Sequence, residues 1–318
     1  MKKNLKIIFM GTSDLAGIIL KELIDSPHKL LAIVTQPDNE NRSRKIKIIS
    51  PVKETAEENG LKIFQPKKLD EKFITELKNL TPDLIIVVAY GKILPEEILE
   101  LPKLKSINVH ASLLPKLRGP SPIQNSLFQG DTETGITIMK MDKGIDTGDI
   151  LSQKKIKIHA DDDYITLTSK LAIAGAKLLL NTISELADNK IKPKKQEDQK
   201  ATICQLIEKS DGKIFWNKDA NSIYNSFRAF RVWPGIFTFW DKDRTIKKIS
   251  LTDISTDVNK DGEKYHLGQV FQRKDKKICV QTSKGIIVID KLQIEGKKEI
   301  DINNFINGYP KIINSILK

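Results

Sequence analysis

The chain has 318 residues, of which 39% are hydrophobic and 30% are charged, and its formal net charge at pH 7 is +12. This composition is typical of a folded protein of about two domains, and with only two cysteines it excludes a disordered chain or a disulfide-rich one. The apolar runs are too short for a signal peptide or a membrane span, so we expect a cytoplasmic protein. The excess of cations fits a polyanionic partner, or compositional bias alone.

Short apolar runs alternate with amphipathic segments in the first half of the chain. The expected strands cover residues 5–10, 30–35, 62–64 and 84–89, and the expected helices cover 14–24, 51–58 and 70–80. Asp14 is the expected cap of the first helix. This alternation predicts an α/β domain with a Rossmann-like parallel sheet, covered by helices on both faces, whose ligands bind beyond the carboxyl ends of the strands. Gly11 and Gly17 do not complete a dinucleotide-binding motif, so a close turn is favoured there.

A basic segment with almost no apolar periodicity separates the second strand from the second helix. It spans residues 39–47 and is expected to form an exposed loop. Its cations are Arg42, Arg44, Lys45 and Lys47. On the residues alone, the segment is either simply solvated or in contact with a polyanion.

The residues with the clearest chemistry lie between positions 106 and 149. Asn108 and His110 are two apart on a predicted strand, so both side chains leave the same face of the sheet. An amide can donate to a developing oxyanion, and an imidazole can move a proton near neutral pH. Gly144 and Gly148 bracket Asp146, so a tight turn could present its carboxylate to the imidazole and fix the tautomer. This set suits acyl transfer without a serine or cysteine nucleophile.

Two neighbouring polar features have competing interpretations. Asp142 and Asp149 add two carboxylates close to Asp146, but Mg²⁺ or Ca²⁺ requires several converging oxygen ligands, so turn capping is favoured over a metal site. Arg118 lies in the loop after His110. It could pair with a phosphate or hold the loop, and the sequence does not decide between them.

The pattern changes after about residue 189. A strand at 150–158 and a helix at 164–186 are followed by a charged stretch, which predicts a catalytic domain at 1–189, a linker at 190–207 and a second domain at 208–318. The second domain begins with a helix at 219–230. Its expected strands cover 236–240, 245–253, 268–273, 278–282 and 285–293, which indicates a small OB-like β-barrel. Phe227, Phe230 and Trp233 are assigned to its core rather than to base stacking.

Several motifs resemble the folate-dependent formyltransferases over nearly the whole chain. They are N-x-H-x-S-L-L-P from Asn108, R-G-x-x-P-I-Q from Arg118, M-D-x-G-x-D-T-G-D from Met141, FMGTSDLA near the start and RAFRVWPG near the end. The last segment resembles the branch of the family that formylates tRNA. Three positions depart from the family pattern, since Ser13 replaces a proline, Leu15 a phenylalanine and Val232 a proline.

The resemblance implies transfer of a formyl group from 10-formyltetrahydrofolate to the amino group of initiator methionyl-tRNA, by a monomer without a metal. Asn108 would stabilise the oxyanion, His110 would move the proton and Asp146 would orient His110. Folate would contact Ala89, Tyr90, Gly91, Ser112, Leu113, Leu114, Pro115 and Asp142. The tRNA would contact Arg42, Arg44, Lys45, Lys47, Lys213, Arg228 and Arg231. The alternatives are a formyltransferase acting on an amino sugar nucleotide and a non-catalytic RNA-binding protein on the same fold.

Overall fold

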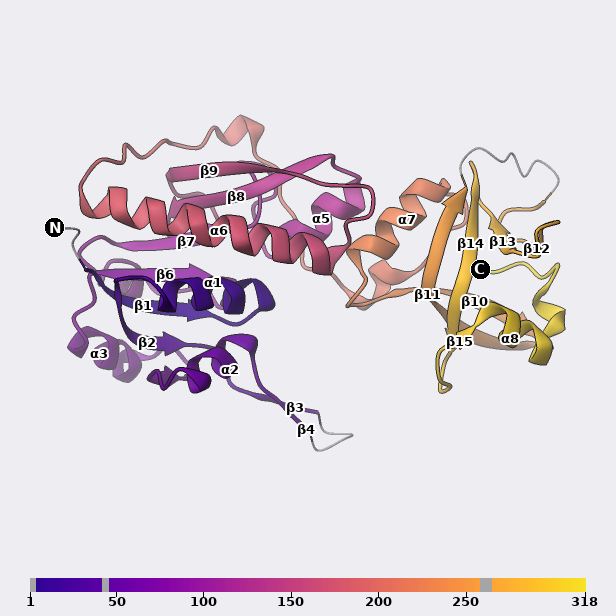
Figure 1. The fold of residues 1–318 in the computed structure, drawn as a ribbon, viewed down its shortest axis with the longest axis horizontal. Coiled ribbons are helices and arrows are strands. Elements are labelled where there is room, and N and C mark those ends of the chain that lie inside the picture. Colours follow the sequence, from indigo (N-terminus) through magenta and orange to yellow (C-terminus); the bar gives the residue numbers. More distant parts are fainter. Residues whose placement is uncertain (1–3, 42–45, 258–264) are drawn as a thin grey trace. The chain divides into compact units, whose positions relative to one another are not determined.

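A computed structural model of the chain describes residues 4–41, 46–257 and 265–318, which form two compact units (Figure 1). The first unit comprises the residues up to Pro122 together with Thr132–His159 and Thr166–Gln205. The second comprises Ile123–Asp131, Ala160–Ile165 and Leu206–Lys318. Two short segments that precede residue 166 therefore belong to the carboxy-terminal unit.

A seven-stranded sheet forms the centre of the first unit, in the order β5-β2-β1-β6-β7-β8-β9. The strands are β1 (Lys6–Gly11), β2 (Lys29–Val34), β5 (Ile63–Phe64), β6 (Leu84–Val88), β7 (Ser106–His110), β8 (Glu133–Lys140) and β9 (Ile150–Lys157). The predicted parallel sheet is confirmed for the first five of these strands, whereas β8 runs antiparallel to both β7 and β9. The sequence did not predict β8, because Thr134, Gly135 and Thr137 interrupt the short apolar run that would mark a buried strand.

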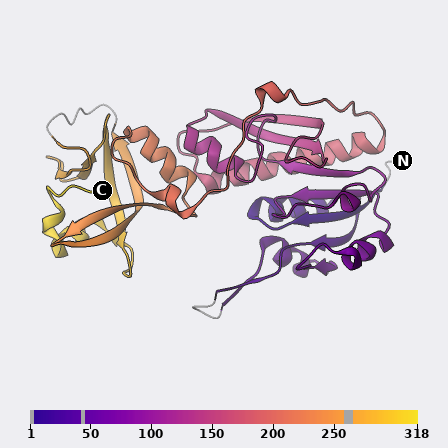
Figure 2. The ribbon, with the colours of Figure 1, turned by 180° about the vertical axis from the view of Figure 1, so that it is seen from behind.

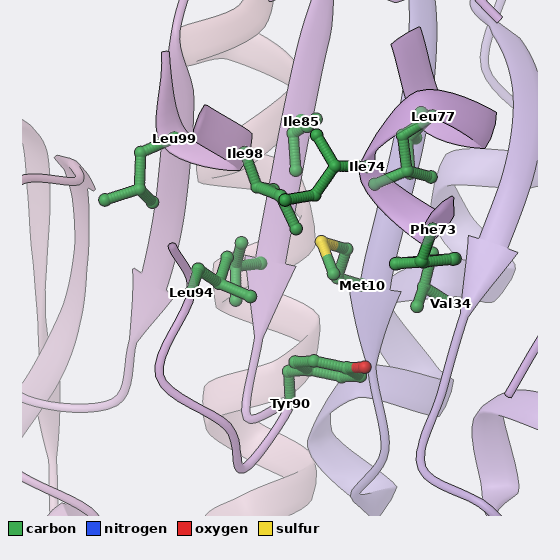
Figure 3. Close-up of a cluster of buried hydrophobic side chains, with 12 residues drawn as sticks. Met10, Val34, Phe73, Ile74, Leu77, Ile85, Tyr90, Leu94, Ile98 and Leu99 are labelled. Atoms are coloured by element: carbon green, nitrogen blue, oxygen red, sulfur yellow. The ribbon is translucent and has the colours of Figure 1, made fainter. Parts of the chain in front are cut away.

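Helices cover both faces of this sheet (Figures 1 and 2). They are α1 (Asp14–Ile24), α2 (Pro51–Glu58), α3 (Glu71–Asn79), α4 (Glu96–Leu99) and α6 (Tyr164–Ala187). On one face, Phe73 and Leu77 of α3 pack against Met10 and Ile85 of the central strands (Figure 3). The central strands β1 and β6 are almost wholly buried, so their apolar residues form the core that fixes the carboxyl edge of the sheet.

The cap of the first helix differs from the expected one. Ser13, rather than Asp14, occupies the N-cap position, and its hydroxyl accepts from the backbone N–H of Ala16 at 3.5 Å. Asp14 is the first helical residue instead, where its negative charge lies favourably near the helix amino terminus. Ser50 and Asp70 cap α2 and α3 in the same way as Ser13 caps α1.

The basic segment expected to be a loop contains a two-stranded antiparallel ribbon. Its strands are β3 (Asn39–Asn41) and β4 (Ile46–Ile48), with Glu40 paired with Lys47. The alternation of isoleucine and lysine in β4 is the signal that the loop prediction overlooked. Arg42, Arg44 and Lys45 lie outside the described residues, and only the backbone of Lys47 is described.

The stretch predicted as a linker is extended but is held against the first unit as far as Gln205. Lys194 forms a β-bridge with Ile150, and Ile203 forms another with Arg118. A short 3₁₀ turn, η1 (Asp198–Lys200), lies between these bridges. This stretch therefore contributes residues to the surroundings of the site described below.

The second unit contains an antiparallel sheet in the order β10-β11-β14-β13-β12. Its elements are α5 (Pro122–Gln129), η2 (Lys209–Gly212), α7 (Ala220–Ala229), β10 (Ile236–Lys242), β11 (Thr245–Asp257), β12 (Val270–Gln272), β13 (Ile278–Gln281), β14 (Ile286–Ile294), β15 (Ile300–Asp301), α8 (Ile302–Gly308) and η3 (Pro310–Ile312). The five predicted strands are confirmed. Leu317 bridges Trp240 of β10, and Ile316 bridges Gln269 just before β12, so this tail segment links the two edge regions of the sheet.

The aromatic residues assigned to the core of this unit have different environments. Phe230 is buried and stacks on Phe128 of α5 at 5.5 Å between ring centroids, as expected for a core residue. Phe227 is half-buried beneath the guanidinium of Arg231. Trp233 is 52% exposed, so its assignment to the core was wrong. It lies in the turn after α7.

Among the described residues, no helix is both long enough and apolar enough to cross a bilayer.

Candidate active site

The carboxylate of Asp146 joins the two polar side chains of β7. The Nδ2 of Asn108 donates to Asp146 Oδ1 at 3.2 Å, and His110 Nδ1 lies 3.4 Å from Asp146 Oδ2. Asn108 is half-buried and His110 is buried, with 5% exposure. The structure thus brings together the amide, the imidazole and the carboxylate that the sequence singled out. The second N–H of the Asn108 amide remains available to donate to another acceptor.

A turn between β8 and β9 holds Asp146 in the left-handed region, at φ +53°. Its Oδ2 accepts from the backbone N–H of Gly119 at 2.8 Å, and its carbonyl oxygen accepts from Gln196 Nε2 at 2.8 Å. Gly148 has no room for a side chain, because a Cβ there would overlap the carbonyl oxygen of Lys140. The glycines around Asp146 therefore allow the close backbone approach that aims the carboxylate at β7.

Both nitrogens of the His110 ring face acceptor oxygens. Nε2 lies 2.9 Å from the carbonyl oxygen of Leu117, while Nδ1 faces Asp146 Oδ2. A neutral imidazole has one N–H donor, so only the doubly protonated ring donates to both oxygens at once. Leu117 is itself fixed at φ +57°, and its N–H donates to Thr202 Oγ1 at 2.9 Å. The ring is therefore held between two acceptor oxygens, one on each side.

The contacts of Arg118 favour a role in holding the loop over a role in binding a phosphate. Its side chain is buried, Nε donates to Gln196 Oε1 at 3.0 Å, and a terminal nitrogen donates to Asp198 Oδ1 at 2.8 Å. Gln196 and Asp198 are site-supporting residues that sequence reasoning missed. They lie in a polar stretch that looks like a solvated linker, and no local pattern distinguishes them from their neighbours.

The three residues at the end of β6, expected to contact folate, form a turn at the carboxyl edge of the sheet. Ala89 and Gly91 are exposed and have positive φ values of 43° and 81°. The Tyr90 carbonyl accepts from Thr12 Oγ1 at 3.2 Å and from Gln36 Nε2 at 3.0 Å. The Tyr90 side chain points into the core instead (Figure 3), where burial raises its pKa to about 12. Within the described residues its hydroxyl has no hydrogen-bond partner.

The Ser112–Pro115 turn begins two residues after His110, and hydrogen bonds hold Ser112 and Leu114 in place. Ser112 Oγ donates to the carbonyl oxygen of Lys116 at 2.6 Å. The N–H of Leu114 donates to Thr137 Oγ1 at 3.1 Å, and the Leu114 side chain is buried. Leu113 and Pro115 are half-buried. Asp142 is exposed, and its Oδ1 accepts from Gly144 N–H and Thr147 Oγ1, so it caps the turn that carries Asp146.

The three cations expected to bind tRNA from the second unit have different surroundings. Lys213 is exposed, with Nζ 5.5 Å from the ring centroid of Phe215. Arg231 is exposed and lies over Phe227 at 5.0 Å. Arg228 is buried, and its terminal nitrogens donate to the Asp162 carbonyl oxygen at 2.9 Å and to Asn225 Oδ1 at 2.6 Å. The burial of Arg228 suits the packing of α7 and not a contact with an external phosphate.

Two further groups bear on the chemistry of this part of the chain. Cys204 and Cys279 are buried free thiols, and burial raises the pKa of both. Cys204 Sγ lies 3.5 Å and 3.3 Å from the carbonyl oxygens of Leu117 and Arg118. In the described part of the chain, no group of three or more His, Cys, Asp or Glu side chains is placed to hold a metal ion.

Family models match both parts of the chain. The model described as formyl transferase matches residues 3–183, and the model described as formyl transferase, C-terminal domain, matches residues 206–310. The chain is 45% identical over 306 residues to the methionyl-tRNA formyltransferase of Caldicellulosiruptor saccharolyticus, covering 95% of this chain and 96% of that protein. The aligned region therefore includes residues of both units.

Two solved structures show the same fold. Methionyl-tRNA formyltransferase from Clostridium thermocellum superposes with a TM-score of 0.54 at 24% identity, over 80% of this chain and 95% of that one. HypX from Aquifex aeolicus in complex with tetrahydrofolic acid superposes with a TM-score of 0.66 at 15% identity, over 98% of this chain and 48% of HypX, so this chain spans about half of HypX. Together with the family models and the 45% identity, these matches show that the chain belongs to the formyl transferase family, in the branch of the methionyl-tRNA formyltransferases.

Proposed function

We propose that this protein transfers the formyl group of 10-formyltetrahydrofolate to the α-amino group of methionine esterified to initiator tRNA. The main support for this proposal is that Asp146 contacts both Asn108 and His110. An oxyanion donor and a proton carrier are thereby held beside the same carboxylate. The high identity to a methionyl-tRNA formyltransferase over nearly the whole chain supports the choice of substrates.

The proposed reaction forms one bond and breaks one bond at the formyl carbon. The neutral amine attacks that carbon, and the free N–H of the Asn108 amide donates to the oxygen that becomes negative. The carbon–N10 bond of the folate then breaks. A proton leaves the amine and N10 gains one, and His110 carries this proton by exchanging its present acceptor, the Leu117 carbonyl, for the reacting nitrogen. Asp146 orients the ring throughout.

Backbone groups at the carboxyl edge of the sheet are suited to a flat heterocycle. In this proposal the pterin contacts the turn Ala89–Gly91, whose exposed backbone is fixed through the Tyr90 carbonyl. The Ser112–Pro115 turn forms a second wall, and Asp142 supports the turn of Asp146. The ordered backbone supports this role, because a rigid turn loses little entropy when a ligand binds.

For tRNA, the proposal keeps the exposed cations and omits the buried one. Lys213 and Arg231 are exposed beside aromatic rings in the second unit, and the β3–β4 ribbon carries Lys47. Arg228 is omitted because it is buried and bonded within its own unit. We assign catalysis to residues 1–189, tRNA binding to 208–318, and support of the active site to the 190–207 stretch through Gln196 and Asp198. The protein is proposed to act as a cytoplasmic monomer.

The test is a formylation assay with 10-formyltetrahydrofolate, without added metal, that compares charged initiator and elongator methionine tRNAs. The proposal expects rapid formylation of the initiator species and slow formylation of the elongator species. Formylation of a nucleotide-linked amino sugar instead would identify the related sugar enzyme. Absence of any formyl transfer, with tRNA binding retained, would identify a non-catalytic RNA-binding protein and refute the proposal.

A further inference from the structure

The β3–β4 ribbon leaves the sheet edge from a base that lies entirely within the described residues. Asp38 is the residue before β3, and β4 ends at Ile48, two residues before Ser50, the cap of α2. The hydroxyls of Thr35 and Ser50 are 2.8 Å apart, so they join the two sides of the base. Thr35 is fully buried. The two ends of the ribbon are thus tied to each other at the sheet.

A buried ion pair lies at this base. Lys53 Nζ is 2.6 Å from Asp38 Oδ2, and the two side chains are only 11% and 7% exposed. Gln65 Nε2 donates to Asp38 Oδ1 at 2.7 Å and to the carbonyl oxygen of Gln36 at 2.9 Å. Both oxygens of the Asp38 carboxylate are therefore engaged. The pair between Lys155 and Glu133 has similar chemistry but side chains that are 71% and 55% exposed.

Stability alone does not explain a buried pair of this kind. Removing two charges from water costs free energy that their attraction only partly offsets, and apolar residues of similar size are often equally stable. The pair instead fixes the direction of the ribbon, because it joins three separate segments. Asp38 precedes β3, Lys53 lies in α2 and Gln65 follows β5. A free two-stranded hairpin is marginally stable in water, so the base of the ribbon determines where it points.

The same contacts extend to the turn proposed for folate. The carbonyl oxygen of Gln36 accepts a hydrogen bond from Gln65 Nε2. The side-chain Nε2 of Gln36 donates to the Tyr90 carbonyl oxygen at 3.0 Å. A continuous series of hydrogen bonds therefore connects Lys53 and Asp38 to the turn Ala89–Gly91. Gln36 is therefore a contact shared by the base of the ribbon and this turn.

We propose that Asp38, Lys53 and Gln65 form a ribbon clamp, a set of positioning residues that aligns the β3–β4 ribbon on the tRNA while the esterified amino acid reaches Asn108 and His110. This inference rests on the proposed function. Without the clamp, the ribbon would have to be ordered when tRNA binds, and that entropy cost weakens the affinity for tRNA. The clamp residues are not among those proposed to contact folate or the reacting atoms, so their loss should leave the chemical step unchanged.

The primary test uses Asp38→Asn and the paired variant Asp38→Leu with Lys53→Met. The paired variant removes both charges together and therefore avoids leaving an unpaired buried charge. In both, the KM for initiator methionyl-tRNA should rise about fivefold or more, while kcat and the KM for 10-formyltetrahydrofolate change by less than about twofold. Glu133→Gln is the matched control, because it breaks an exposed Lys–Glu pair of the same unit and should leave all three constants unchanged. Unchanged tRNA KM in the clamp variants would overturn the proposal.

A second test distinguishes positioning from general support of the fold. In a variant whose residues 39–48 are replaced by a short Gly-Ser linker, adding Asp38→Asn should raise the tRNA KM no further, because the clamp acts through the ribbon. An equal additional rise in that background would refute the clamp.

Hydrogen exchange provides a readout that does not depend on the enzyme's activity. Amides of Asn39–Asn41 and Ile46–Ile48 should exchange faster in Asp38→Asn than in the unmodified chain, while amides of β1 and β6 should not. Faster exchange in a chain that fails to formylate any tRNA would refute the proposed function and leave the ribbon clamp as a structural finding. Equal exchange in a chain that formylates normally would refute the clamp alone.

Discussion

The backbone N–H of Gly119 donates to Asp146 Oδ2 at 2.8 Å, and so ties the loop after β7 to the turn between β8 and β9. The same oxygen faces His110 Nδ1 at 3.4 Å. One carboxylate oxygen thus sets both the position of the loop and the orientation of the imidazole. A substitution at Gly119 or Asp146 should therefore alter the position of His110 relative to the reacting atoms.

Asp146→Asn should lower kcat by about a hundredfold, because an amide at this position no longer attracts an imidazolium and can present N–H groups to the N–H of Gly119. The KM for folate should change little. Steady-state formylation measures both constants. Glu133→Gln is the control, since Glu133 is an exposed carboxylate of the same unit, and a loss of similar size there would refute a special role for Asp146.

Replacing Asn108 or His110 with alanine should lower kcat at least about a hundredfold, because each change removes either the oxyanion donor or the proton carrier. Single-turnover formylation at saturating folate and tRNA measures the chemical step. Circular dichroism and the unfolding midpoint provide the check on folding. Turnover close to that of the unmodified enzyme in a folded variant would exclude that residue from its role.

Gly119→Ala should destabilise the first unit by about 2 to 4 kcal/mol, because its φ is +119° and a Cβ would overlap the carbonyl oxygen of Cys204. Gly60→Ala is the control that isolates backbone strain, since Gly60 has φ +62° and a Cβ there would meet no atom within 4 Å. A loss of about 1 kcal/mol is expected for that control. Denaturant unfolding measures both. Equal losses would show that the Cys204 contact contributes nothing.

Tyr90→Phe should leave the stability at neutral pH unchanged or slightly higher, since the buried hydroxyl has no partner among the described residues. Burial raises the pKa of Tyr90 to about 12 from 10.0, so the unfolded state releases its proton first as the pH rises. The free energy of unfolding should therefore fall between about pH 10 and about pH 12, and less steeply in Tyr90→Phe. Identical pH dependence in the two proteins would show that Tyr90 does not titrate differently on unfolding.

Binding of uncharged initiator tRNA should weaken more than about tenfold between about 50 and about 200 mM salt, because exposed cations such as Lys213 and Arg231 displace counterions from phosphates. Fluorescence anisotropy across a salt series gives the slope. Lys213→Ala should make the slope shallower by about one unit. A flat dependence would mean that phosphate contacts contribute little to tRNA binding.

The sequence predicted the fold where local patterns and buried runs agree. Strands β1, β2, β6 and β7 and helices α1 to α3 were identified because apolar runs, caps and turns mark them. Strand β8 was missed because Thr134, Gly135 and Thr137 break its apolar run into pieces too short to mark a buried strand. The ribbon was taken for a loop because its strands are only three residues long.

The same limit applies to the site. Asn108, His110 and Asp146 were found because two of them share a strand face and glycines mark the turn of the third. Gln196 and Asp198 were not found, since their contacts with Arg118 and with the turn of Asp146 are tertiary and leave no trace in the local pattern. Arg228 looked like an exposed cation because sequence spacing does not show that Asp162 lies beside it.

The tail segment that bridges Trp240 and Gln269 has a consequence for how the second unit is made in the cell. Strands β10 to β14 leave the ribosome before Ile316 and Leu317 are available to pair with them. During that interval both borders of the nascent sheet have unpaired backbone groups, which invite association with other chains. A chain that lacks Ile316 and Leu317 would keep these backbone groups unpaired after synthesis, and we expect it to aggregate more readily.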